Sequence, residues 1–383
     1  MKQKLAILIY SLAGGGAERV VSVLLQELKE QYEITLVLMR DKIDYEIPSD
    51  IKIHFIENSN PYENGILKLL KLPYLGWKYK KFCQKNSINI SLAFMNRPSY
   101  VSILAKLFGS NIYTIISERT TPSMMYGKDN LFSKISKVLI STLYPKSDFI
   151  VSNSEGNRLD LIENFSITPQ IIQTVYNPFD LEKIEKLSLE KVDGFEFTKF
   201  TFVSVGRLDY GKNHKLLINA FSKLDVDKIE LIILGEGELR VKLEDQIQAL
   251  GLEKSVFLLG FDNNPYKYFS KANAFVFSSN YEGFPNVLVE ALSCGLSVIS
   301  TDCKSGPREI LSPSSDFSFQ LKENIELTDY GILVPVNREK ELIEGMRYMM
   351  NSWHEKNVKV RGNSFDKKTV VREYINILNR GEK

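Results

Sequence analysis

Two separate series of short apolar segments alternate with amphipathic segments along the chain, and this pattern constrains the fold most. In the first series, residues 5–10 are predicted as a buried strand, and residues 14–16 are three consecutive glycines. Residues 17–28 then carry an apolar stripe at helical spacing, and residues 34–38 are predicted as the next strand. Strand, turn, helix and strand in this order make a parallel α/β unit. Further short strands are predicted at residues 90–94, 112–116 and 149–151.

This rhythm stops near residue 178, and the charged stretch up to residue 200 is predicted as a linker. A second α/β series follows, so the predicted fold is two Rossmann-like α/β domains whose parallel sheets face an interdomain cleft, where ligands bind. The predicted boundaries are 1–178 and 179–366, and a helical segment at 367–383 is a candidate to pack back on the first domain. The strands predicted for the second series are residues 202–205, 231–234, 256–259, 274–277 and 297–300.

The formal net charge of +2 conceals an uneven distribution of charge. Residues 64–147 contain 13 Lys and Arg against two acids, a local charge of +11. Within them, residues 66–85 interleave six lysines with large apolar side chains, which favours a basic amphipathic surface for anionic lipid. A solvated helix face with a buried side remains the alternative. No nucleic-acid motif accompanies the charge, so nucleic acid is not an expected partner.

The chain has three cysteines, an odd number that gives no complete disulfide framework, and this fits a reducing cytosol. No run of 18 apolar residues occurs, and no membrane-spanning helix is therefore expected.

Residues 282–290 form the most informative local motif. Glu282 and Glu290 lie eight positions apart, and Pro285 is expected in the first turn of a helix. This places Glu290 about 7–8 Å further along the helix axis. The two carboxylates therefore suit two parts of one ligand, with Glu282 on sugar hydroxyls and Glu290 on ribose hydroxyls. The turn and helix start, which we expect to face phosphates and sugar, comprise Gly283, Phe284, Pro285, Asn286 and Val287.

A second motif directly follows the strand predicted at residues 202–205. Arg207 offers a planar fork for phosphate oxygens, and Lys212, five positions later, offers a point charge. Together they can clamp a diphosphate at the carboxyl end of a parallel strand. An ordinary basic loop is the alternative. A ligand with central phosphates and hydroxyls at both ends is a nucleotide sugar.

The glycine run is weaker evidence by itself. Gly15 and Gly16 allow the backbone to approach a phosphate or an acceptor closely, and a plain tight turn is the alternative. A metal site is not expected, because the three histidines are scattered and Asp225 and Asp227 fit a surface turn better. Arg207 and Lys212 can instead neutralise a leaving diphosphate.

Taken together, these motifs resemble the large retaining glycosyltransferase family of two-Rossmann-domain architecture, family 4 with the GT-B fold. The resemblance covers essentially the whole chain. It implies transfer of a sugar from a nucleoside diphosphate with retained anomeric configuration, usually without a metal. The segments that carry it are residues 14–19, 205–208, 212–213, 234–237 and 282–290.

The chain is also similar to the α-1,4-N-acetylgalactosaminyltransferases of bacterial N-linked protein glycosylation. This likeness implies UDP-GalNAc as donor and a glycan on undecaprenyl diphosphate as acceptor. It further implies a peripheral position on the inner face of the cytoplasmic membrane. The segments concerned are residues 7–12, 45–48, 67–73, 96–98 and 260–268.

The family's functional residues map onto the motifs already described. The resemblance implies that Arg207 and Lys212 bind the diphosphate, that Glu282 and Glu290 hold the transferred sugar and the ribose, and that the backbone of Gly260, Phe261 and Asp262 meets the uracil. Many members have a histidine where this chain has Arg119, which is a candidate to supply charge there. No protein nucleophile is assigned. We favour front-face transfer in which the leaving phosphate assists deprotonation of the acceptor.

Three alternatives remain open at this point. One is a transferase of the same fold in lipopolysaccharide or capsule synthesis with another UDP-hexose donor. Another is a non-catalytic nucleotide-sugar-binding protein, although this chain retains the whole donor set. The third is a nucleotide-sugar epimerase of the same fold, which needs no basic amphipathic surface.

Overall fold

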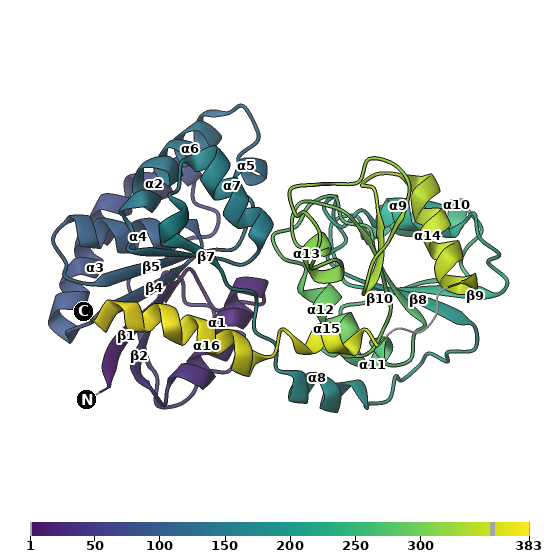
Figure 1. Ribbon diagram of the computed structural model, residues 1–383, viewed down its shortest axis with the longest axis horizontal. Helices are drawn as coiled ribbons and strands as arrows, with labels where there is room; N and C mark the ends of the chain where they lie inside the picture. Colours follow the sequence, from purple (N-terminus) through teal and green to yellow (C-terminus); the bar gives the residue numbers. More distant parts are fainter. Residues whose placement is uncertain (1, 353–356, 383) are drawn as a thin grey trace. The chain divides into compact units, whose positions relative to one another are not determined.

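The computed structural model describes residues 2–352 and 357–382 and contains two compact units (Figure 1). Unit 1 comprises Met1–Phe179 and Lys367–Lys383, and unit 2 comprises Asp180–Asp366. Each unit is built around its own parallel sheet, flanked by helices on both faces, as the alternation of strands and helices in the sequence predicts.

The sheet of unit 1 has seven parallel strands in the described part of the chain, in the order β3-β2-β1-β4-β5-β6-β7. The order reverses between β1 and β4, which pair directly. The sequence does not predict β3 or β7, because β3 is largely exposed and β7 has three residues. The strands are β1 (Gln3–Ile9), β2 (Tyr32–Leu38), β3 (Lys52–Phe55), β4 (Ile90–Phe94), β5 (Tyr113–Glu118), β6 (Phe149–Ser152) and β7 (Ile172–Thr174).

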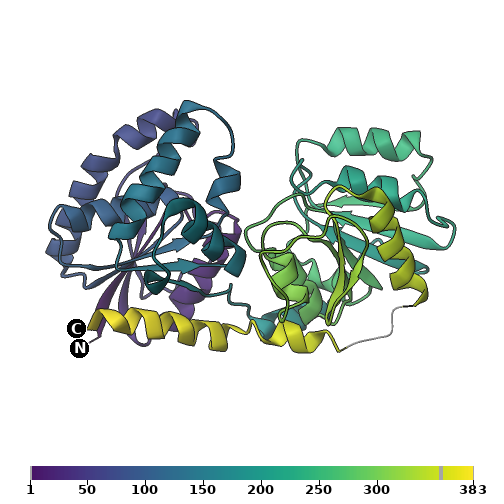
Figure 2. The same ribbon diagram turned by 45° about the horizontal axis from the view of Figure 1, so that its top comes forward.

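Helices α1 (Gly16–Leu28) and α16 (Lys367–Leu378) share one hydrophobic cluster with the sheet of unit 1. The apolar stripe of α1 is buried there, which confirms the predicted helix. Figures 1 and 2 show α16 running beside unit 1, and Lys367 N donates to Phe179 O at 2.8 Å where the chain re-enters this unit. The other helices of unit 1 are α2 (Gly65–Leu70), α3 (Leu72–Asn86), α4 (Asn96–Leu107), α5 (Pro122–Met125), α6 (Leu131–Leu143) and α7 (Glu155–Phe165).

The basic stretch at residues 66–85 folds as two helices, α2 and α3, that meet at Lys71. Helix α3 buries Leu72, Leu75 and Tyr79 at helical spacing, so this helix has the buried side of an ordinary amphipathic helix. Its outer side nevertheless exposes large apolar groups, and the Lys81 ammonium lies 4.1 Å from the centre of the Trp77 ring. Burial and an exposed basic aromatic surface therefore coexist on this helix.

Unit 2 has the sheet order β10-β9-β8-β11-β12-β14-β13, in which β13 alone of the described strands runs antiparallel, against β14. Here the order reverses between β8 and β11. The sequence predicts neither β13 nor β14. Strand β13 has only two residues, and the four residues of β14 are too few to show a strand periodicity. The strands are β8 (Phe200–Val205), β9 (Ile229–Leu234), β10 (Val256–Gly260), β11 (Ala274–Phe277), β12 (Val298–Thr301), β13 (Glu326–Leu327) and β14 (Gly331–Val334).

The predicted linker up to residue 200 is wrong in part, because it contains a helix, α8. The Asp180 side chain accepts from Lys183 N at the start of this helix, and Ile184 is buried. Helices α9, α10 and α14 pack on one face of the unit 2 sheet (Figure 1). The helices of unit 2 are α8 (Leu181–Ser188), α9 (His214–Phe221), α10 (Arg240–Ala249), α11 (Tyr266–Phe269), α12 (Asn286–Ser293), α13 (Pro307–Leu311), α14 (Glu339–Asn351) and α15 (Lys359–Asn363).

The packing of α16 predicts a large stability difference between two neighbouring substitutions. Tyr374 is buried against the unit 1 core, whereas Arg372 is exposed on the same helix. We expect Tyr374→Ala to lower the free energy of unfolding by about 3–5 kcal/mol, since it leaves a cavity of aromatic size. Arg372→Ala should change it by less than about 0.5 kcal/mol. Denaturant unfolding measures both, and equal small effects would show that α16 does not contribute to the core.

Candidate active site

Two of the predicted motifs meet in unit 2. The loops after β8 and β11 extend from neighbouring strands, at the point where the strand order reverses. Ligands of open α/β sheets bind at this position. The loops are joined by hydrogen bonds from Asn280 N to Gly211 O at 2.8 Å and from Asn280 Nδ2 to Tyr210 O at 2.7 Å. The Ser278 hydroxyl also donates to Lys212 O at 2.9 Å. These bonds fix the backbone that carries Lys212.

The Lys212 ammonium donates to Glu282 Oε1 at 2.5 Å. The two side chains are 26% and 14% exposed, and the ammonium lies 5.3 Å from the centre of the Phe277 ring. A charge-assisted hydrogen bond in this partly desolvated position is strong. The sequence assigns these residues to phosphate and sugar separately and does not predict their contact. Because they are paired, a ligand that engages one side chain also affects the other.

Arg207 occupies a different position on the same loop. Its side chain is 77% exposed, and its Nε lies 3.7 Å from Asp209 Oδ2. The backbone beneath it is rigid, because Leu208 N donates to Glu236 O at 3.0 Å. Gly235, with φ at +143°, approaches so closely that a Cβ atom there would lie 2.0 Å from Gly206 O. Arg207 is thus an accessible guanidinium on a fixed loop.

Glu290 lies on α12 and is 3% exposed. Its Oε1 accepts from the Tyr266 hydroxyl at 3.3 Å, whereas Glu282 pairs with Lys212. The two carboxylates therefore have different partners. The predicted helical start is wrong by one residue, because Pro285 is the N-cap and the helix begins at Asn286.

The turn that follows Glu282 is held by residues 304–306 after β12, a segment that the sequence does not predict as part of the site. Glu282 N donates to Lys304 O at 2.9 Å, and Ser305 N donates to Glu282 O at 3.0 Å. The Ser305 hydroxyl donates to Gly283 O at 2.9 Å. Carboxyl ends of parallel strands share one edge, so a strand prediction at 297–300 is the signal that can find this segment.

The rest of the predicted turn packs inward. Phe284 is buried, and its ring centre lies 5.7 Å from that of Phe365. A Cβ atom at Gly306 would lie 2.4 Å from Pro285 Cδ, so the backbone of the 304–306 segment packs directly against the Pro285 ring. Val287 belongs to the first turn of α12. The backbone of the turn is therefore supported on the side away from solvent.

The predicted uracil segment follows β10. Gly260 has φ at +79°, and its carbonyl accepts from Gly235 N at 2.7 Å. The side chain of Phe261 is 73% exposed. Asp262 Oδ2 lies 2.9 Å from Lys267 Nζ. Burial raises the pKa of Asp262, but hydrogen bonds from Asn264 N and Lys267 outweigh this effect and hold the pKa below its usual value. The Asp262 side chain thus stabilises its own turn.

The glycine turn of unit 1 lies after β1. Gly15 is the N-cap of α1, and Gly16 is its first residue. A Cβ atom at Gly15 would lie 2.3 Å from Glu18 Oε2, so a larger residue there would displace the flexible Glu18 side chain. Burial raises the pKa of Glu18. Gly14 N donates to Asp44 Oδ2 at 3.1 Å. Two carboxyl groups therefore lie beside the predicted phosphate or acceptor turn.

Arg119 does not supply an accessible charge. Its side chain is buried, and Nη2 donates to Asn177 Oδ1 at 2.9 Å while Nη1 donates to the Tyr374 hydroxyl at 3.4 Å. Arg119 therefore links the end of β5 to Asn177, near the end of residues 1–179 of unit 1, and to α16. Neighbouring Glu118 is also buried, which raises its pKa, and accepts from the Tyr144 hydroxyl at 2.7 Å. Both residues belong to an internal network of unit 1.

Within residues 2–352 and 357–382, no group of three or more His, Cys, Asp or Glu side chains is placed to hold a metal ion. Burial lowers the pKa of His214 to about 4, His54 stacks on Phe82, and His354 lies outside the described residues. Asp225 pairs with Lys228 at 2.7 Å in a turn.

The same described residues contain no helix of the length and apolarity that crossing a bilayer requires.

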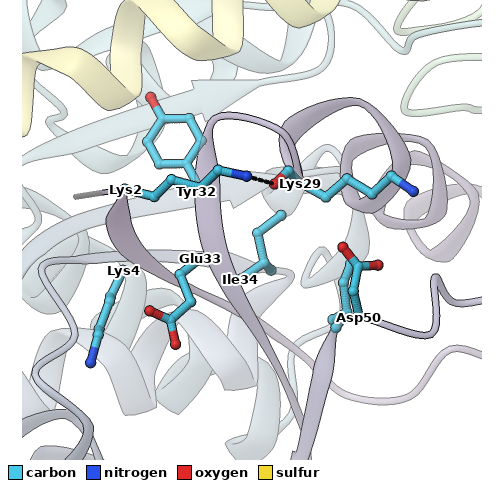
Figure 3. Close-up of a pocket in the computed structure, with 8 residues that line it drawn as sticks. Lys2, Lys4, Lys29, Tyr32, Glu33, Ile34 and Asp50 are labelled. Atoms are coloured by element: carbon cyan, nitrogen blue, oxygen red, sulfur yellow. Dashed lines mark hydrogen bonds between the residues drawn. The ribbon is translucent and has the colours of Figure 1, made fainter.

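A cavity of about 380 Å³ opens in unit 1 (Figure 3). It lies near the amino ends of β1 and β2, at the edge of the sheet opposite to the glycine turn. Lys2 Nζ donates to Lys29 O across it at 3.0 Å. None of the predicted site residues lines this cavity, so it is not part of the candidate site. Its lining comprises Lys2, Lys4, Lys29, Tyr32, Glu33, Ile34, Asp50 and Ile51.

Comparison with known proteins identifies the family and the fold. Residues 188–366 match the family model described as glycosyl transferases group 1, and residues 14–183 match the model described as glycosyltransferase family 4. The fold is that of HepE from Anabaena in complex with UDP, with a TM-score of 0.76 at 17% identity over 99% of this chain and 100% of that one.

Two curated relatives come from Campylobacter jejuni subsp. jejuni serotype O:2. One is N-acetylgalactosamine-N,N'-diacetylbacillosaminyl-diphospho-undecaprenol 4-alpha-N-acetylgalactosaminyltransferase, which is 46% identical over 98% of this chain and 99% of its own length. The other is GalNAc-alpha-(1->4)-GalNAc-alpha-(1->3)-diNAcBac-PP-undecaprenol alpha-1,4-N-acetyl-D-galactosaminyltransferase, 23% identical over 98% of each chain. The chain therefore belongs to the glycosyltransferases with the GT-B fold.

Proposed function

We propose that this chain is a retaining family 4 transferase that moves N-acetylgalactosamine from UDP-GalNAc to a glycan on undecaprenyl diphosphate, forming an α-1,4 linkage in protein N-glycosylation. The observation that carries the transferase activity is the Lys212–Glu282 pair across the two loops at the switch point of unit 2. The choice of donor and acceptor rests on the 46% identity to the Campylobacter relative over nearly its full length.

In this proposal each polar group of unit 2 contacts one part of the donor. Arg207 and Lys212 neutralise the charge that develops on the leaving diphosphate, so the reaction proceeds without a metal or other cofactor. Glu282 accepts hydrogen bonds from hydroxyls of the transferred sugar, and Glu290 accepts from the ribose. The backbone contributions within unit 2 come from Gly260, Phe261, Asp262, Gly283, Phe284, Asn286 and Val287, and Pro285 shapes the turn.

The transfer itself occurs on one face of the sugar. The bond from the anomeric carbon to the leaving phosphate oxygen breaks as the acceptor oxygen bonds to the same carbon. The leaving phosphate takes the acceptor proton. Glu282 does not act as the nucleophile in this scheme, because its carboxylate is held by the Lys212 ammonium at 2.5 Å.

A lipid-linked acceptor is anchored in a membrane, so the enzyme must work at the membrane surface. We propose that unit 1 contacts the anionic membrane on its cytoplasmic face. Exposed apolar side chains occur on α2, α3, α5 and α6, and Gly65 of α2 lies against the Phe132 ring of α6. Lysines lie between them along the chain, and such surfaces bind anionic lipid. The exposed apolar residues are Leu67, Leu70, Tyr74, Trp77, Met124, Met125, Leu131 and Val138.

The charge clamp predicts a large loss of transfer on removal of either cation. We expect Lys212→Ala and Arg207→Ala each to lower kcat by about 100-fold or more, because each removes charge stabilisation from the leaving group. Product formation from UDP-GalNAc and an undecaprenyl-diphosphate-linked glycan is followed by mass spectrometry. Lys228→Ala, in an exposed turn of the same unit, is the matched control. Losses under about tenfold for both variants would refute the clamp.

Glu282 should matter more for turnover than for nucleotide binding. Glu282→Gln removes the negative charge and keeps the side-chain size, so we expect kcat to fall while the Kd for UDP stays nearly unchanged. Titration calorimetry gives the Kd, and Glu244→Gln on the exposed side of α10 serves as control. A parallel loss of UDP binding would show that Glu282 acts on the nucleotide, directly or through Lys212.

The membrane surface is tested with lysines that are not held by the protein backbone. Lys78 donates to Ile56 O and Lys80 to Phe108 O, so Lys81 and Lys85 are the better targets. Replacing both with Ala should weaken binding to phosphatidylglycerol vesicles by about 2 kcal/mol, roughly 30-fold, at low salt. The difference should shrink as salt rises. Vesicle binding that does not respond to the double substitution would make this surface an ordinary helix face.

A further inference from the structure

Unit 1 contains a group of polar side chains that belongs to none of the predicted sites. Arg97 Nη1 donates to Glu57 Oε2 at 2.7 Å, and Nη2 donates to Glu57 Oε1 at 3.1 Å. These two side chains are only 12% and 13% exposed. The Ser59 hydroxyl accepts from Arg97 Nη1 at 3.2 Å and from the Tyr10 hydroxyl at 3.1 Å. We call Tyr10, Glu57, Ser59, Glu63, Lys71 and Arg97 the Arg97 cluster.

The Arg97 cluster lies where the sheet of unit 1 is expected to bind a ligand. Tyr10 directly follows β1, and Arg97 is the second residue of α4, which follows β4. These two strands pair with each other at the point where the strand order reverses. In unit 2 the Lys212–Glu282 pair occupies the corresponding position, after β8 and β11. Open α/β sheets bind ligands at this point.

The polar groups of the cluster are not all satisfied by the protein. Arg97 Nε is buried and has no hydrogen-bond partner among the described residues, and the same holds for Glu63 Oε2. Lys71 pairs with the other oxygen of Glu63 and lies 3.9 Å from Glu57 Oε1. An unsatisfied buried polar atom costs about 1–3 kcal/mol, so a purely structural ion pair is normally complete.

The backbone beside the cluster is also strained. Met95, which joins β4 to α4, has φ at +70°, a region that residues other than glycine rarely adopt. Met95 N donates to Ser117 O at 3.0 Å, and Met95 O accepts from the Ser99 hydroxyl at 2.7 Å. These bonds hold the strained turn in place and with it the start of α4. Such strain collects at functional sites.

We infer that the Arg97 cluster binds the terminal sugar of the acceptor glycan and selects it. Arg97 donates and Glu57 accepts hydrogen bonds with the hydroxyl and acetamido groups of that sugar. The ligand is uncharged because the cluster contains two cations and two carboxylates, and the carboxylates repel a phosphate. This inference rests on the proposed function as a transferase acting on a lipid-linked glycan.

The test uses two undecaprenyl-diphosphate acceptors that differ only in their terminal sugar, N-acetylgalactosamine or glucose. Arg97→Lys keeps the charge and removes the planar fork. We expect it to raise the KM for the preferred acceptor about tenfold, a change of about 1.4 kcal/mol. The Kd for UDP, which binds through unit 2, should stay at the wild-type value. Glu57→Gln should act in the same direction.

The selectivity between the two acceptors makes the test independent of folding. The ratio of their kcat/KM values is measured on one enzyme sample, so partial unfolding cancels from it. We expect Arg97→Lys to reduce this ratio at least about fivefold, and an unchanged ratio would overturn the inference. Glu33→Gln is the matched control, because Glu33 pairs with Lys52 at 2.8 Å between β2 and β3 of the same sheet. If the wild-type enzyme modifies neither acceptor, the proposed function fails, and the inference fails with it.

Discussion

The Lys212–Glu282 pair is the contact on which the candidate site of unit 2 depends. It joins the loops after β8 and β11 at the switch point, and the backbone around it is fixed from three strands. Asn213, with φ at +52°, donates from Nδ2 to Asn280 Oδ1 at 3.1 Å and to Asn337 Oδ1 at 2.8 Å. Because Asn337 follows β14, this network spans the carboxyl ends of β8, β11 and β14. A rigid frame of this kind places charge before a ligand arrives.

Much of this frame follows from the sequence. The strands at residues 202–205 and 274–277 are predicted correctly, and because parallel strands end at one edge of a sheet the motifs after them lie together, although their contact is not predicted. The expected helical stripe of α1 is buried as the pattern predicts. These predictions succeed because they depend on periodicity and chain direction, which are local properties of the sequence.

Other features depend on contacts between residues that lie far apart in the chain, and local sequence patterns do not reveal such contacts. Arg119 looks like an accessible charge beside a predicted strand, yet its partners Asn177 and Tyr374 lie 58 and 255 residues away. The segment at 304–306 supports Glu282 through its backbone, which has no side-chain signature. The Arg97 cluster likewise forms from residues on three connections of unit 1, and an ion pair such as Arg97–Glu57 leaves no mark in the sequence.

A double-mutant cycle for transfer from UDP-GalNAc tests whether Lys212 and Glu282 act as one functional element. The rates of the wild type, Lys212→Ala, Glu282→Gln and the double variant give the coupling energy between the two side chains. We expect a coupling of at least about 1 kcal/mol, with the double variant little worse than Lys212→Ala alone. Additive losses, with a coupling near zero, would contradict it.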